Sequence, residues 1–201
     1  MDTRNLLLVE HGLIHSAAVV AATDTQVSEL VWVRTNDGQR RQCIEGHNSL
    51  AWIFWHMARV EDVYVNRLIR GVPELLDRED WLKRLGVDTR EIGTGDTETA
   101  VEALSQRIDL MALKEYRDAV GRETRSWLAN MDIEQLDDLI DMDERLAETP
   151  RYFDPERAAW VNPAGQKRKV ASIWTWGVIG HSYVHLGEAG HVTRTLGIPG
   201  R

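Results

Sequence analysis

The stretch that decides the fold of this chain is SLAWIFWHMARVED, residues 49–62. Ser49 is a suitable helix N-cap, and the apolar run that follows it continues until Gly71 and Pro73. The run lacks the period-two alternation that marks a half-buried strand. We therefore expect one long helix over 48–70.

Helical patterns extend on both sides of this stretch. In the N-terminal part, Leu7, Ile14 and Trp32 fall on one face if each residue turns ~100°. The predicted helices besides 48–70 are 4–33, 98–131 with breaks near Asp109 and Asn130, Ile133–Ile140, and 170–196. We find no strand pattern that would make a sheet and no internal repeat. Long helices with two long connections predict an all-α four-helix bundle, with residues 1–201 as a single domain. The connections over 72–96 and 141–165 are expected to form the rim of a pocket.

Composition limits the class of protein. The 201 residues include 24 basic and 32 acidic side chains, a net charge of −8, which disfavours a nucleic-acid partner. No apolar run approaches the roughly 20 residues that span a bilayer, and the start of the chain lacks the pattern of a signal peptide. We therefore expect a cytoplasmic protein with no membrane partner. Cys43 is the single cysteine, so this chain can form neither an internal disulfide nor a thiolate metal cage.

The last predicted helix carries a pair of histidines, His181 and His185. Residues four apart project from the same helix face with Cβ atoms ~5–6 Å apart, so the two imidazoles can coordinate one metal ion. His56 lies on the face of the 48–70 helix that should be buried. If the two helices run antiparallel, His56 completes a three-histidine site, which would leave coordination positions open for water or substrate. Imidazole ligands suit zinc, nickel, iron or copper.

Spacing alone leaves other readings open. A histidine on an apolar helix face is commonly a hydrogen-bonded core residue, and His11 and His15 form a second pair with the same spacing. Interior glycines favour the later pair, because each costs ~0.8–1.0 kcal/mol of helix propensity relative to alanine. Either close helix packing or space for a ligand must offset that cost. These glycines are Gly177, Gly180, Gly187 and Gly190.

Three side chains are candidates for the pocket or for the shell around the ligands. Trp174 lies seven residues before His181 on the same stripe and is a candidate pocket wall. Glu188 is a fourth ligand, an acceptor that orients a histidine ring, or a surface carboxylate. His15 lines the pocket as a proton shuttle or lies at the edge of the core.

Helical phase places several polar side chains outside the proposed ligand set. These are His47, His191, Glu61 and Asp62. We expect His47 at a helix end and His191 at the surface or at an oligomer contact. For the two acidic residues we expect salt bridges with Arg59 or Arg67.

Two blocks of the chain resemble the DinB-like metalloenzyme family. They are residues 49–62, which contain His56, and GHSYVHLGE, residues 180–188, which contain the later pair. In that family one histidine on the second helix and a His-x-x-x-His on the fourth, followed by x-Gly-Gln or x-Gly-Glu, hold a divalent metal. The resemblance thus implies that His56, His181 and His185 are ligands in an up-down-down-up bundle. It covers most of the chain, but its specific content lies in these two blocks.

The resemblance implies metal-dependent chemistry and leaves the reaction open. Family members include thiol-dependent S-transferases, which use mycothiol, bacillithiol or glutathione, and a maleylpyruvate isomerase. We therefore expect zinc or nickel, with iron as a further option, a small-molecule substrate, and a thiol S-transferase or hydrolase activity with or without a low-molecular-weight thiol. The alternative is a non-catalytic helical bundle with a structural or adventitious metal. We also expect a homodimer, because the family often pairs through bundle faces and eight tryptophans exceed what one modest core readily hides.

Overall fold

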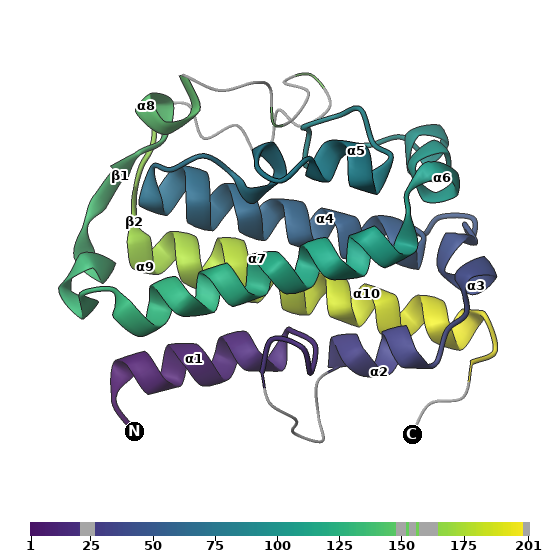
Figure 1. The fold of residues 1–201 in the computed structure, drawn as a ribbon, viewed down its shortest axis with the longest axis horizontal. Helices are drawn as coiled ribbons and strands as arrows, with labels where there is room; N and C mark the ends of the chain where they lie inside the picture. The colour runs from purple at the N-terminus through teal and green to yellow at the C-terminus, as the bar shows by residue number, and fades with distance from the viewer. Residues whose placement is uncertain (21–26, 148–151, 153–155, 157–164, 199–201) are drawn as a thin grey trace.

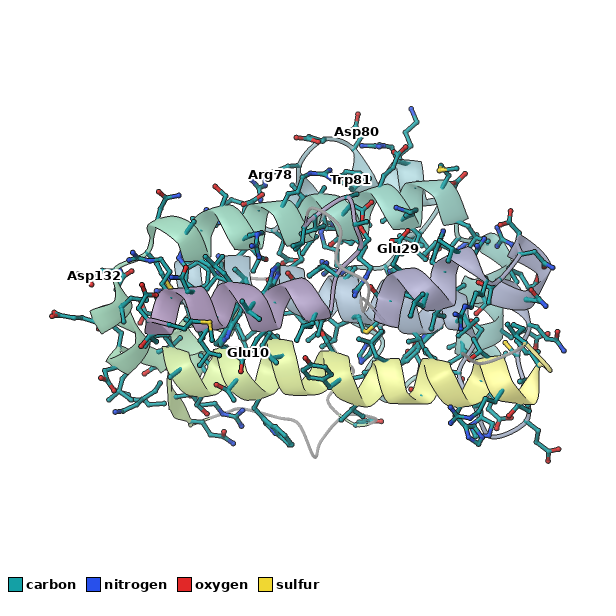
Figure 2. The ribbon with its side chains drawn as sticks, turned by 90° about the horizontal axis from the view of Figure 1, so that it is seen from below. Glu10, Glu29, Arg78, Asp80, Trp81 and Asp132 are labelled. Carbon is teal, nitrogen blue, oxygen red and sulfur yellow. The ribbon has the colours of Figure 1, made fainter. Side chains whose placement is uncertain are left out.

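The computed structural model describes residues 1–20, 27–147, 152, 156 and 165–198, and these residues are mainly helical. Long helical segments lie alongside one another and shorter elements cover their ends (Figure 1). From below, α1 (Thr3–Leu13) and α2 (Val27–Val33) form a row between α7 (Leu110–Asn130) and α10 (His181–Thr195) (Figure 2). The mainly helical structure confirms the all-α prediction. The up-down-down-up order remains an expectation from the resemblance.

The predicted helix over 48–70 is present and forms the centre of the core. It consists of α4 (Leu50–Asp62), whose residues are all buried, and η1 (Val63–Arg70), which continues it with π-helical hydrogen bonding. The Ser49 hydroxyl caps it by accepting a hydrogen bond from the Trp52 N–H at 3.0 Å. Gly71 ends it in the left-handed region, at φ 65°, a conformation that glycine adopts without steric cost.

The last predicted helix is also present. It consists of α9 (Val170–Ser172), the π-helical η5 (Ile173–Gly180) and α10. α10 packs against α4 and η5 packs against η1, so the two long segments run antiparallel. Close packing accounts for Gly177, because a Cβ atom there would lie 2.2 Å from Cδ1 of Tyr64. It does not account for Gly187, where a Cβ would meet no described atom within 4 Å.

The predicted break near Asp109 is confirmed. α6 (Glu98–Arg107) ends before it, and α7 begins after it with the Asp109 carboxylate accepting a hydrogen bond from the Ala112 N–H at 2.8 Å. α7 packs against both α1 and α4. It therefore contacts both the N-terminal helix and the central helix of the core.

The prediction of a single helix over 4–33 is wrong. α1 ends at Leu13, residues 14–20 form turns, and residues 21–26 lie outside the described part of the chain. The Ser16 hydroxyl accepts a hydrogen bond from the Ala18 N–H and donates one to Asp118 on α7. Such side-chain bonds compete with helical hydrogen bonds, which explains a break that apolar periodicity did not reveal.

The prediction of a helix over 133–140 is also wrong. Residues Ile133–Asp137 form a 3₁₀ turn, η3, and β1 (Leu139–Asp141) follows it. β1 pairs antiparallel with β2 (Lys167–Lys169), so a two-stranded sheet exists where we expected none. The pairing partner lies 28 residues further along the chain in the register Ile140 to Arg168, a contact that local periodicity cannot report.

Short elements complete the described structure. They are α3 (Asp37–Arg41), η2 (Leu75–Asp77), α5 (Trp81–Leu85) and α8 (Met142–Ala147). Within the described ranges, none of the helices combines the length and the hydropathy that crossing a bilayer requires.

Candidate metal centre

Three histidines from the two antiparallel segments converge at one point. The ring of His56 on α4 lies 4.8 Å from that of His181 and 4.7 Å from that of His185, both on α10. The two α10 rings are 4.5 Å apart. Nε2 of His181 lies 3.0 Å from Nε2 of His56, 125 residues away in sequence. The three residues that spacing and resemblance singled out therefore form one cluster, the three-histidine cluster, with donor atoms close enough to share an ion.

Hydrogen bonds set the orientation of two of these rings. His56 donates its Nδ1–H to the carbonyl oxygen of Ile92, and His185 Nδ1 lies 2.8 Å from a carboxylate oxygen of Glu188. A carbonyl oxygen can only accept, so the proton of the neutral His56 ring resides on Nδ1 and its Nε2 keeps a lone pair. Nδ1 of His181 is buried and has no hydrogen-bond partner among the residues that the structure describes.

Two histidines of this cluster, His56 and His181, are held in their neutral form. Burial, reinforced by the neighbouring His181, lowers the pKa of His56 well below its ordinary value. Burial and the nearby His185 lower the pKa of His181 to about 3. Metals bind the deprotonated nitrogen, so protons do not compete for these two rings near neutral pH. The donor set therefore fits a divalent ion of the imidazole-binding kind.

Glu188 occupies the position of a ring-orienting acceptor, one of the three roles left open above. Besides His185, it accepts a hydrogen bond from the Asn48 side chain at 2.8 Å. Burial raises the pKa of Glu188, but the hydrogen bonds from His185 and Asn48 outweigh burial and hold it below the usual range. An ionised acceptor on the far nitrogen makes the metal-facing nitrogen of a histidine more basic.

An aromatic side chain that we did not single out covers the cluster. Trp52 stacks on His56 with ring centroids 4.5 Å apart and an interplanar angle of 18°. Its Nε1–H donates to Asp96 at 3.0 Å. The spacing of Trp52 and His56, one turn apart on α4, was the available signal for this contact.

A cavity of about 420 Å³ is connected to the cluster only through residues that hold its neighbours, because none of the three histidines lines it. Its lining includes Asn48, which holds Glu188, and Asp96, which holds Trp52. Asp96, at the end of the 72–96 connection, therefore lines this cavity. The 141–165 connection lies largely outside the described residues, but the carbonyl of Tyr152 accepts a hydrogen bond from the Ile92 N–H at 2.7 Å.

A second cluster of titratable residues corrects two predictions. Glu61 does not pair with Arg59 or Arg67: its carboxylate lies 3.0 Å from Nε2 of His11 and 2.8 Å from Nε2 of His15. His15 thus belongs to this second cluster and does not line the first. The salt bridge expected for Asp62 is present, at 3.5 Å from Arg59.

Trp174 is also placed differently from our expectation. Its ring lies 5.8 Å from that of His11 and 6.2 Å from that of Trp127, so it packs beside the second cluster. It shares a stripe with His181, but the π-helical turns of η5 lie between the two residues and change the angle per residue. Trp52, and not Trp174, is the indole stacked on the three-histidine cluster.

The remaining histidines lie apart from both clusters. The rings of His47 and His191 are 4.7 Å from each other, near the start of α4 and toward the end of α10. Neither joins the groups of residues that could share an ion. The prediction that these two histidines lie outside the ligand set therefore agrees with the geometry.

Comparisons with known proteins agree with this architecture. The family model of the DinB superfamily matches residues 16–189. A solved structure, described as the conserved protein of a locus from Enterococcus faecalis, is similar with a TM-score of 0.68 and 18% sequence identity, over 96% of each chain. At this identity the likeness shows the fold alone. No curated protein matches.

Proposed function

We propose, because this chain belongs to the DinB superfamily, that His56, His181 and His185 hold a divalent metal ion. The observation that carries the proposal is the convergence of three imidazoles. In His56 and His185, Nδ1 is hydrogen-bonded to an oxygen acceptor, which leaves Nε2 available for an ion. Three protein ligands leave open positions for water or substrate, which is the arrangement of catalytic metal sites. Zinc or nickel suits this ligand set best, and iron is a further option.

We propose a thiol S-transferase or hydrolase activity at this site. A divalent ion bound there would supply Lewis acidity, which lowers the pKa of a thiol or a water molecule toward neutrality. The residues of the chain hold the ligands in place: Ile92 fixes the tautomer of His56, and Glu188 fixes the ring of His185. Trp52 covers one face of His56 and limits the access of water.

The cavity that reaches the cluster through Asn48 and Asp96 favours a particular charge of substrate. Its described lining contains no lysine or arginine and carries the carboxylates of Glu45, Asp96, Glu98 and Glu102 together with the imidazole of His47. A cleft lined by one sign of charge concentrates ligands of the opposite sign. We therefore propose a neutral or cationic small-molecule substrate, and we rank strongly anionic thiols below neutral ones.

The alternative function is a non-catalytic dimeric bundle with a structural metal. It draws on the exposed apolar side chains of the last helix, where Trp176 is 71% and Val184 is 64% exposed. Tyr183 is 44% exposed, so the outer face of the last helical segment carries three exposed apolar side chains. A homodimer that buries this face is compatible with both functions.

Elemental analysis and turnover assays distinguish these proposals. Protein purified without a polyhistidine tag is compared with its His185→Ala variant, first for metal content and then for consumption of thiols or esters from a panel that spans negative, neutral and positive charge. Loss of an ion together with loss of turnover supports the enzyme. Loss of an ion from a protein that turns over no substrate, with a fall in thermal stability, supports the structural alternative. Equal metal content in both proteins contradicts the site.

A further inference from the structure

We propose that His11, His15 and Glu61 form a second metal site that binds zinc or a divalent ion of similar size and ties α1 to α4. The two imidazoles and the carboxylate are a ligand set typical of zinc. The proposal is independent of the three-histidine cluster, because the two sites share no residue.

The donor atoms of this site already converge. Nε2 of His11 lies 3.0 Å from Oε1 of Glu61, and Nε2 of His15 lies 2.8 Å from Oε2. The two imidazole rings are 4.4 Å apart. Ligands at ~2.0–2.1 Å from a tetrahedral zinc ion lie ~3.3–3.4 Å from one another, so shifts of about half an ångström would seat an ion. Each imidazole faces a different oxygen of the Glu61 carboxylate, so the carboxylate can bind the ion through one oxygen or chelate it through both, in a distorted tetrahedral site.

This site is closed to solvent, in contrast to the first. His11 and His15 have no exposed surface and Glu61 is 1% exposed. Closed sites with a full set of protein ligands are structural, whereas open sites are catalytic. We therefore assign this ion a role in stability and no role in turnover.

The chain makes room for the cluster on a neighbouring helix. Gly121 lies inside the 21-residue helix α7, where a Cβ atom would lie 2.6 Å from both Cε1 and Nδ1 of His15. A glycine in a helix interior costs ~0.8–1.0 kcal/mol relative to alanine. A side chain at position 121 would displace the His15 ring, so packing of that ring against α7 offsets the lower helix propensity of glycine.

The charges of the cluster suit a cation. Burial raises the pKa of Glu61, but the adjacent His15 and His11 outweigh burial and lower it well below the usual range. Burial lowers the pKa of His15 to about 4, so that ring is neutral. A buried carboxylate needs a counter-charge. Arg117 on α7, whose guanidinium donates to the Ile14 carbonyl, is electrostatically attracted to Glu61 and supplies part of it.

Metal stoichiometry tests the proposal on the wild-type protein. Untagged protein from zinc-supplemented medium is analysed by inductively coupled plasma mass spectrometry before and after incubation with EDTA. We expect about two zinc ions per chain at first and one EDTA-resistant ion afterwards, released only when guanidinium unfolds the protein. A folded protein that retains no zinc after EDTA overturns the proposal, and this result does not depend on any variant folding.

Variants identify the residues that hold the resistant ion. Glu61→Gln keeps the size of the side chain and removes its charge, and we expect it to lose only the EDTA-resistant ion. Glu10, labelled in Figure 2, directly precedes His11 on α1, and Glu10→Gln is the matched control that should retain both ions. His185→Ala should lose only the EDTA-sensitive ion, so failure of the first site and failure of the second are distinguishable. Retention of the resistant ion in Glu61→Gln contradicts the assignment.

Discussion

His56 and Glu61 lie five residues apart on α4 and belong to two different clusters. Five residues rotate a helix by ~140° beyond one full turn and advance it by ~7.5 Å. His56 therefore faces α10 and the later histidine pair, while Glu61 faces the histidines at and just after the end of α1. α4 is buried on every side, so it can present polar groups to two neighbours at once. Both candidate metal sites depend on the placement of this one helix.

The first prediction concerns the three ligands of the open site. His185→Ala should lose most of the EDTA-sensitive metal, because it removes one of only three protein ligands. His191→Ala removes an exposed imidazole outside the cluster and should leave the metal content unchanged. Metal analysis of the two variants, with circular dichroism to check folding, decides the matter. Similar losses of metal in both variants would contradict the assignment of His185 as a ligand.

The second prediction concerns Glu188 as a positioning residue. Glu188→Ala removes the acceptor of the His185 Nδ1–H, and loss of such an outer partner typically weakens metal binding about 10–100-fold. Competition with a chromophoric chelator measures the change in affinity. Glu102→Ala removes a carboxylate that lines the cavity and contacts no histidine of the cluster in the described structure, so it serves as the control. An unchanged affinity in Glu188→Ala would show that the contact does not orient the ring for binding.

The third prediction compares two glycines of the last helix. Gly177→Ala places a Cβ atom against the Tyr64 ring, and such overpacking costs about 1–3 kcal/mol. Gly187→Ala meets open space and should raise stability by up to ~1 kcal/mol through helix propensity. Urea denaturation of both variants gives the two free energies of unfolding. If the two substitutions change stability alike, the contact between Gly177 and Tyr64 does not limit the packing of η5 on η1.

The fourth prediction concerns the pH dependence of stability. Burial raises the pKa of Glu123, but hydrogen bonds from Arg78 and Arg70 outweigh it and hold the pKa below 4.5, its ordinary value. The native carboxylate thus binds protons less readily than the unfolded one, so its contribution is present above about pH 4.5 and is lost as the pH falls below that value. The difference in unfolding free energy between wild type and Glu123→Gln should be larger at pH 7 than at pH 3.5. A difference that does not change with pH would contradict the role of these ion pairs.

Much of the site was predictable because it rests on local patterns. The run that begins at Ser49 and the spacing of His181 and His185 place the histidines on two buried helix faces. Helical periodicity is a property of neighbouring residues, so it can be read without knowing the fold. Resemblance to a family then selected His56 and the later pair over His11 and His15, a choice that spacing left open.

What only the tertiary structure decided is which neighbour covers each buried face. Helical phase correctly turned Glu61 away from His56, but it could not name His11 and His15 as the partners, because they lie 50 and 46 residues away and reach Glu61 only through the packing of α1 on the core. In the same way, the break after Leu13 depends on a hydrogen bond from the Ser16 hydroxyl to Asp118 on α7. The strand β1 depends on pairing with β2, which lies further along the chain. The sequence by itself thus determined the two long helical segments that carry the three-histidine cluster and the faces they bury. The contacts between distant segments followed from how those faces pack, since burial favours contact without specifying the partner.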